Sequence, residues 1–208
     1  MRHALGAALL GLAISISLPL AAQETGADKP AAAQPQMTPE MQKMMEAWQK
    51  TSTPGPQHKQ LVEHFAGTWN TKQTMWMDPS APPTTETGKD VSTLFGDRHV
   101  RTEFNSQFMG QPFTGIAMTS YDNVTGKYIG SWIDSVSTGQ FMAEGDYDPA
   151  TKTYTFHGEM ADPMKAGAMT KVREVIRIID KDNHVMEWYE MRDGKEQKTM
   201  EIVYTRAK

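Results

Sequence analysis

Tyr121-Asp122-Asn123-Val124-Thr125-Gly126-Lys127-Tyr128 recurs in the chain as Tyr147-Asp148-Pro149-Ala150-Thr151-Lys152-Thr153-Tyr154. Both tyrosines, the aspartate and the threonine return after the same spacing of 26 residues. Each copy is a polar turn between segments in which residues alternate, which is the pattern of a β-hairpin. Two hairpin turns that lie one strand pair apart predict an antiparallel meander.

The period of two persists from Gly67 almost to the end of the chain and predicts ten strands. Asp193-Gly194 and Asp180-Lys181-Asp182-Asn183 form further hairpin turns. Ten strands joined by short turns are expected to curl and close, because closure removes unpaired edges. The expected fold is mainly β, a closed antiparallel meander barrel whose interior can hold a small ligand. The predicted strands are 67–77, 84–95, 98–108, 112–121, 128–135, 138–147, 153–161, 170–180, 184–192 and 196–206.

Three segments precede the barrel domain, which is expected over residues 66–208. Residues 1–22 combine a basic start, an apolar run and small residues, which predicts a signal peptide. An uncleaved anchor is the alternative, but the run is shorter than the roughly 20 residues of a membrane span. Residues 23–36 predict a disordered linker, and residues 37–65 predict one or two helices. We therefore expect an exported protein, periplasmic or secreted, with no stable membrane span.

Composition excludes several classes of function. The net charge is −4, and an exported form without Arg2 is more negative still, which argues against a nucleic-acid partner. The chain has no cysteine, so disulfides and thiol chemistry are excluded. Nucleophile, zinc-protease and phosphate-loop motifs are also missing from the sequence. The sequence favours a binding protein without a cofactor over an enzyme and does not define an oligomeric state.

The hairpin turns sort the residues of the repeated region into two faces. Placing Tyr147 opposite Tyr154 aligns Gly145 with Phe156 on a largely apolar face, which is expected to point inward. The other face places Glu144 beside His157, and these two with Glu159 are expected to be solvated rather than to bind a metal. Read in the same way, the first copy directs four candidate residues inward. They are Tyr121, Tyr128, Trp132 and Asp134.

An apolar stripe of Met41, Met44, Met45 and Trp48 is expected along the first helix. The outer face of the first hairpin is also apolar, since it carries Ile116, Met118, Ile129 and Ile133. The hypothesis that joins the two is that the helix covers this patch.

Several short motifs point to a known family, namely His58–Leu61, Gly67–Trp69, Trp76–Pro79, Tyr121–Asp122, Tyr128–Ser135 and Met200–Arg206. Together they resemble a bacterial family known as domain of unknown function 1579, which has a calycin-like barrel. The similarity covers roughly residues 55 to 206, and the family has no established activity, so it implies the fold and no catalytic residue. In related lipocalin-like barrels the tryptophan of the first strand stacks against a basic residue near the chain's end. The resemblance therefore implies that Trp69 meets Arg206.

Two carboxylates complete the candidate site, each with an alternative interpretation. Asp134 is either a buried carboxylate that orients a polar ligand or the cap of the turn after its strand. Glu187 lies on one face with Ile176 and Met200 if the last two turns pair regularly, and either face of those strands can be the interior. The candidate ligand-binding residues are Tyr121, Tyr128, Trp132, Asp134, Tyr154, Phe156 and Glu187.

Three functions are compatible with these residues. The first is a non-enzymatic barrel for a small apolar or amphipathic molecule. The second is a hydrolase or isomerase that uses Asp134 or Glu187 in the lumen. The third is an envelope protein that binds another protein through an apolar patch.

Overall fold

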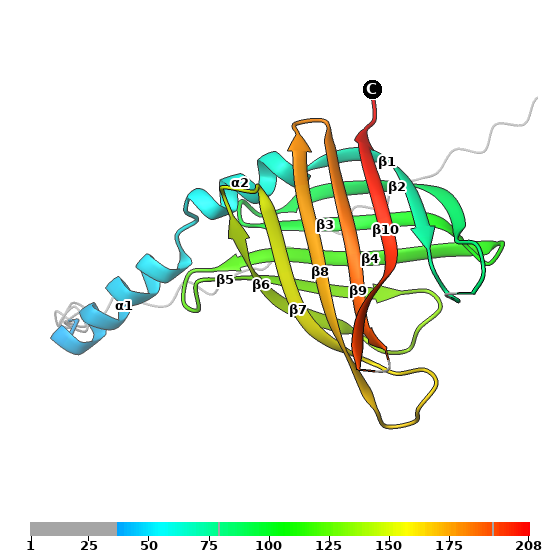
Figure 1. Cartoon of the computed structure of the whole chain (residues 1–208). Coiled ribbons are helices and arrows are strands. Elements are labelled where there is room, and N and C mark those ends of the chain that lie inside the picture. The colour runs from blue at the N-terminus through cyan, green and yellow to red at the C-terminus, as the bar shows by residue number, and fades with distance from the viewer. Residues whose placement is uncertain (1–36, 79, 193) are drawn as a thin grey trace, which may run out of the picture. The chain divides into compact units, whose positions relative to one another are not determined.

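The computed structural model describes residues 37–78, 80–192 and 194–208, and it contains two helices followed by ten strands (Figure 1). The expected signal peptide (1–22) and linker (23–36) lie outside the described residues. No helix within the described ranges is long and apolar enough to cross a membrane. The elements are α1 (Pro39–Ser52), α2 (Pro56–Phe65), β1 (Gly67–Met75), β2 (Thr84–Phe95), β3 (His99–Phe108), β4 (Gln111–Asp122), β5 (Lys127–Asp134), β6 (Phe141–Asp148), β7 (Thr153–Ala161), β8 (Met169–Asp180), β9 (Asn183–Arg192) and β10 (Lys195–Arg206).

The strands form one closed barrel in which each strand is antiparallel to the next. Pairing of β1 with β10 closes the cylinder, as the adjacent β1 and β10 ribbons in Figure 1 show. The predicted fold class is therefore confirmed, and each predicted strand agrees with the structure to within three residues at either end. Because every edge is paired, the alternation of each strand divides the residues into a lumenal set and an outer set.

The sequence repeat corresponds to two equivalent turns. Asp122 accepts a hydrogen bond from the backbone N–H of Val124 at 2.8 Å, and Asp148 accepts one from Ala150 at 2.9 Å. In each copy the threonine hydroxyl donates to the other oxygen of the same aspartate. The repeat thus encodes a turn capped by an aspartate side chain. The flanking pairs, Tyr121 with Tyr128 and Tyr147 with Tyr154, have the predicted register.

Two irregularities move the last strands out of the expected register. One lies between Ile178 and Asp180 where β8 pairs with β9, and the other between Lys198 and Met200 where β9 pairs with β10. Each inserts one extra residue, and a shift of one residue exchanges the two faces of a strand. The inner face of β8 to β10 therefore combines Ile176 with Met186, Trp188 and Met200.

Helix α2 covers the end of the barrel where β3 begins (Figure 1), which we call the helix end. Leu61 is fully buried there against Val100, Tyr128, Tyr154 and Ile178. The opposite end, where β1 leads into β2 and β7 into β8, is called the loop end.

The predicted contact between Trp69 and Arg206 is present at the helix end. The Arg206 guanidinium lies 4.1 Å from the centre of the Trp69 ring. The indole N–H donates to the carbonyl of Phe65 at 2.9 Å, and Arg206 Nη1 donates to the carbonyl of Ala66 at 2.9 Å. These bonds join α2, β1 and β10, and they give Trp69 a structural role.

The proposed cover for the outer apolar patch is wrong. Met41, Met44, Met45 and Trp48 of α1 are all exposed, and α1 has no buried residue. The patch is also not buried, because Ile116 and Ile133 remain exposed on the outer face of the barrel.

Candidate functional site inside the barrel

The seven candidate residues do not form one site. Tyr121, Tyr128 and Tyr154 belong to or pack against the cluster at the helix end. Phe156 is a buried member of the same cluster and is paired with Gly145 and Glu174, whereas Trp132 and Asp134 lie toward the loop end. Glu187 is not lumenal.

Glu187 pairs with Val175 and Glu201, which puts it on the outer face of the barrel. Its carboxylate lies 3.2 Å from Arg177 and 3.1 Å from Lys198. The placement of Glu187 beside Ile176 and Met200 was therefore wrong, because the two irregularities reverse the face that regular turns would give.

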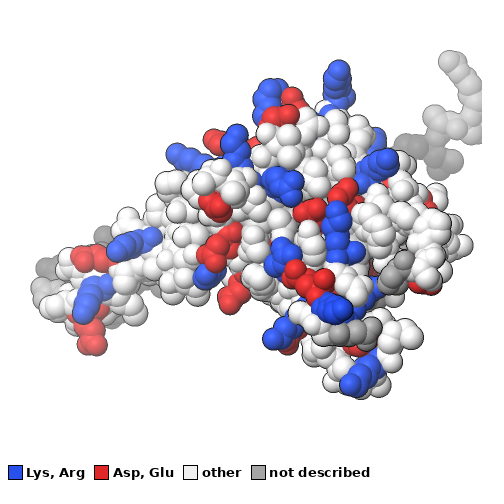
Figure 2. Space-filling view, in the orientation of Figure 1, with Lys and Arg blue, Asp and Glu red and all other residues white. Residues whose placement is uncertain are grey.

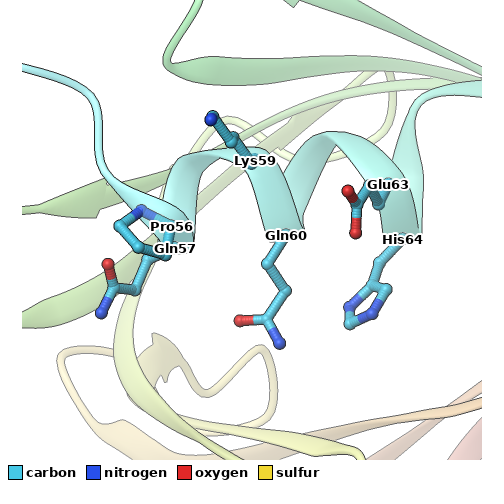
Figure 3. Close-up of a pocket in the computed structure, with 6 residues that line it drawn as sticks. All are labelled: Pro56, Gln57, Lys59, Gln60, Glu63 and His64. Carbon is cyan, nitrogen blue, oxygen red and sulfur yellow. The ribbon is translucent and has the colours of Figure 1, made fainter.

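The tyrosines of the helix end hold α2 in place. The Tyr128 hydroxyl donates to Gln60 Oε1 at 2.9 Å, and the Tyr154 hydroxyl lies 2.8 Å from His64 Nδ1. Figure 3 shows Gln60 and His64 projecting from the same side of α2, one helical turn apart. Burial raises the pKa of Tyr128 to about 12, so this hydroxyl stays protonated and keeps its role as a donor.

A shallow groove runs along α2 beside these two side chains (Figure 3). Because Gln60 and His64 are already hydrogen-bonded to the barrel, the groove reflects how α2 docks. Its lining residues are Pro56, Gln57, Lys59, Gln60, Glu63 and His64.

Asp134 caps the turn after β5, as its alternative interpretation predicted. One oxygen accepts hydrogen bonds from Val136 N at 2.9 Å and from Ser137 N at 2.7 Å. The Ser137 hydroxyl donates to the same oxygen, and the Trp132 indole donates to the other at 3.0 Å. Partial burial alone would raise the pKa of Asp134, but these hydrogen bonds outweigh it and lower the pKa.

Trp132 points inward and is partly buried, as predicted. Its ring covers Gly115, where a Cβ would lie 2.1 Å from the indole, so this glycine makes room for the ring. The Trp132 ring stacks with Phe113 at a centroid distance of 6.3 Å and meets Phe104 at 6.2 Å. Together these rings form one aromatic wall of the lumen.

A second aromatic pair and an open position lie on the facing strands. Phe141 packs against Trp188 with ring centroids 4.8 Å apart and covers Gly158. Gly130 is different, because a Cβ built there would meet only the Phe156 ring, at 3.9 Å, an ordinary contact distance. A single Cβ would therefore fit at Gly130 in ordinary contact with the Phe156 ring.

The structure adds two lumenal carboxylates that the sequence did not single out, Glu174 and Asp90. Glu174 projects inward between Phe156 of β7 and Trp188 of β9. Burial raises the pKa of Glu174 to about 7, and no hydrogen bond or ion pair with any other described residue offsets that burial. By accessible surface the residue as a whole is nonetheless only partly buried.

Asp90 is buried on the inner face of β2, paired with Phe104. Its carboxylate accepts one hydrogen bond, from the Ser92 hydroxyl at 2.8 Å. Burial raises the pKa of Asp90 to about 6, although the Ser92 hydroxyl opposes this shift. Burial raises the pKa of the Tyr204 hydroxyl, and the negative charges of Asp90 and Glu174 raise it further. Tyr204 is therefore near enough to both acids to interact with them electrostatically.

Two buried polar atoms on the inner face of β1 complete this region. Thr71 pairs with Tyr204, and Gln73 pairs with Ile202. Thr71 Oγ1 and Gln73 Oε1 are inaccessible from outside and have no hydrogen-bond partner among the described residues. Buried polar groups normally have partners, so this region is polar and incompletely satisfied. We call Asp90, Glu174, Tyr204, Thr71 and Gln73 the lumenal polar cluster.

The residues described contain no group of three or more His, Cys, Asp or Glu side chains that could hold a metal ion. Glu144 and His157 pair with each other on the outer face, as predicted. On the face shown in Figure 2, basic and acidic side chains are interspersed rather than gathered into one basic surface.

Comparisons with known proteins identify the fold and leave the activity undefined. A family model described as "Protein of unknown function (DUF1579)" matches residues 53–206. The chain is similar to the crystal structure of Rv2717c from M. tuberculosis, with 14% sequence identity and a TM-score of 0.54, over 75% of this chain and 100% of that chain. A redesigned beta barrel matches with 12% identity and a TM-score of 0.35, over 69% of this chain and 91% of that chain. No curated protein sequence matches this chain.

Proposed function

The chain belongs to the DUF1579 family, and we propose that it is an exported barrel that holds a small amphipathic molecule in its lumen. The observation that carries the proposal is Glu174, an unpaired carboxyl between Phe156 and Trp188 inside the barrel. Leaving a buried carboxyl without a partner is costly, and the cost is removed when a bound molecule supplies one. Aromatic walls beside a small number of polar groups are typical of small-molecule sites.

The loop end supports entry of such a molecule. Four of the connections there each expose an apolar side chain to solvent, namely Met77, Met109, Val136 and Met164. An apolar rim lowers the free energy of an amphipathic molecule as it leaves water and approaches the lumen.

Binding can be tested with N-phenyl-1-naphthylamine, a neutral probe that fluoresces in apolar surroundings. We expect saturable fluorescence and energy transfer from lumenal tryptophan to the probe. Gly130→Leu projects a large side chain into the lumen beside Phe156 and should abolish both signals. Ser131→Leu adds the same side chain to the next residue, which faces outward with Met118 and Met142, and should leave them unchanged. Equal binding by the two variants, with unchanged circular dichroism, would place the probe outside the lumen.

Export rests on the sequence of residues 1–22. Protein recovered from the cell envelope should begin near residue 23 when its N-terminus is sequenced. Recovery of the chain only from the cytosol, with Met1 still present, would refute export and leave the binding proposal untouched.

A second candidate, a hydrolase or isomerase with a lumenal carboxylate, now depends on Glu174. Its raised pKa of about 7 lies in the range of an efficient general acid or base. Asp134 is occupied by four hydrogen bonds, and Glu187 lies outside the barrel. Hydrolysis of 4-nitrophenyl butyrate that disappears in Glu174→Gln would favour the enzyme over the binding protein.

A further inference from the structure

Charge is unevenly distributed over the inner face of the barrel. By cross-strand pairing, five carboxylates face inward, and the cations that share this face in the described part of the chain all lie at strand ends. Arg192 bonds to Glu190 at 2.8 Å, Lys195 is exposed at the loop end, and Arg206 covers Trp69 at the helix end. The inward carboxylates are Glu86, Asp90, Asp134, Glu174 and Glu190.

Two of these carboxylates lack a cationic partner deep in the lumen. Asp134 and Glu190 are occupied, the first by its turn and Trp132, the second by Arg192, Trp188 and Thr199. Asp90 accepts only the Ser92 hydroxyl, and Glu174 has no partner among the described residues. The two acids therefore bring negative charge into the lumen without a cation that pairs with it, Glu174 beside Trp188 and Asp90 beside Trp69.

We propose that the lumenal polar cluster selects an amphipathic molecule with a cationic, hydrogen-donating head group, such as a primary alkylamine. This inference rests on the proposed function and specifies its ligand. Glu174 and Asp90 supply carboxylate oxygens that accept hydrogen bonds from an ammonium group. Gln73 Oε1, a buried acceptor without a partner among the described residues, adds negative partial charge to the same region.

The members of the cluster lie on strands of the same side of the barrel. Thr71, Gln73 and Asp90 lie on neighbouring strands β1 and β2, and Tyr204 lies on β10 on the other side of β1 (Figure 1). Glu174 approaches from β8, and its charge reaches Tyr204, as the raised pKa of that tyrosine indicates. The cluster therefore lines one side of the lumen, from β2 through β1 and β10 to β8.

The neighbouring rings favour the same ligand. Glu174 lies between Phe156 and Trp188, whose ring faces attract a cation electrostatically when water is excluded. The alkyl part of the molecule would extend toward the rings of Trp132, Phe104 and Phe113. A carboxylate head group at the same place would face Asp90 and Glu174 without a free cation, so a fatty acid is excluded on electrostatic grounds.

The test displaces N-phenyl-1-naphthylamine at pH 7.5 with three amphiphiles of equal chain length below their micellar concentrations. Dodecylamine should displace the probe at least about tenfold more effectively than dodecanol, and dodecanoate should be weakest. Glu174→Gln should lower the affinity for dodecylamine by about 10- to 100-fold. The affinity for dodecanol should stay unchanged, because the substitution removes only a charge-assisted interaction. Asp90→Asn should have the same effect with a smaller magnitude.

Glu144→Gln is the matched control, because it removes the same charge from an exposed position on the outer face. If Glu144→Gln lowers the affinity for dodecylamine as much as Glu174→Gln does, the preference for a cation comes from the overall charge of the protein and the inference is wrong. Equal displacement by dodecanoate and dodecylamine also overturns it, while the proposed function survives. If neither the probe nor any amphiphile binds, the proposed function itself fails.

Discussion

The helix end and the rest of the lumen are both built from aromatic and polar side chains, but their hydrogen bonding differs. At the helix end most polar groups have partners, and His184 Nδ1 is the buried side-chain atom there that lacks one among the described residues. At the helix end the hydroxyls of Tyr128 and Tyr154 have partners on α2, and Arg206 has both a ring and carbonyls to contact. In the middle, Glu174 has no partner among the described residues. Completed hydrogen bonds mark groups that stabilise the fold, and incomplete ones mark groups retained at a cost in stability.

The largest expected effect is at the helix end, where packing is complete. Leu61→Ala should lower the free energy of unfolding by about 2–5 kcal/mol, because Leu61 is fully buried and its loss leaves a cavity. Urea denaturation followed by circular dichroism measures this change. Leu94→Ala is the matched control, since Leu94 is about half exposed at 48% and should change stability by less than about 1 kcal/mol. Similar losses in the two variants would show that α2 is not part of the barrel core.

The opposite sign is expected in the middle of the lumen. Glu174→Gln should stabilise the empty barrel at pH 8 by roughly 1–3 kcal/mol, because the ionised carboxylate is destabilised by burial. The pKa of Glu174 is raised from 4.5 to about 7, so the folded state binds the extra proton and the wild type loses stability as pH rises from about 4.5 to 7.

The difference between variant and wild type should therefore be large at pH 8 and small below pH 5. Melting temperatures at the two pH values measure it, with Glu144→Gln as the control for loss of one surface charge. A destabilising Glu174→Gln at pH 8 would mean that Glu174 has a partner in solution, and the contrast between the two regions would no longer hold.

His184 links the two regions and should give an effect of intermediate size. It stacks on Tyr204 at 4.2 Å and meets the Trp69 ring at 4.5 Å. Burial, followed by the charges of Arg206 and His64, lowers the pKa of His184 from 6.5 to about 3. The unfolded state then binds the extra proton, so this contribution to stability is complete above pH 6.5 and declines toward pH 3.

Acidification from pH 6.5 to 5.5 should cost the wild type about 1 kcal/mol through His184. The variant His184→Gln is less stable overall, but its stability should fall less over this interval. His157→Gln, at an exposed position of β7, is the matched control for the loss of one imidazole side chain. The readout is the difference in slope between each variant and the wild type, which cancels the contributions of Asp90 and Glu174.

The contrast between the regions also explains which features could be predicted. Tight turns such as Asp122–Gly126 carry their own register, so the faces of β4 to β7 followed directly from the sequence. Asp90 and Glu174 follow longer connections, 76–83 and 162–168, and no residue pattern gives the register across such a loop. The signal for Glu174 was present, since it alternates with Val172 and Ile176 as a single acid on an apolar face.

The irregularities at Ile178–Asp180 and Lys198–Met200 had no comparable signal. The turns beside them predict regular pairing, and only the packing of the closed barrel decides where an extra residue is accommodated. The prediction for Glu187 failed for this reason, whereas that for Trp132 succeeded because β5 follows a short turn and pairs without a shift.

Substitution of Asp134 should have the smallest effect on stability. It separates polar groups whose hydrogen bonds are complete from those of the lumenal polar cluster. The Asp134 oxygens accept four hydrogen bonds, so Asp134→Asn should lower the free energy of unfolding by about 1 kcal/mol and shift the emission of Trp132, whose indole donates to it. Dodecylamine displacement should remain within about twofold of the wild type, since this carboxylate caps a turn and is not part of the lumenal polar cluster. Asp148→Asn is the matched control, because it weakens an equivalent capped turn at the helix end without touching a tryptophan. A tenfold loss of dodecylamine binding in Asp134→Asn alone would move the head group from Glu174 toward the loop end.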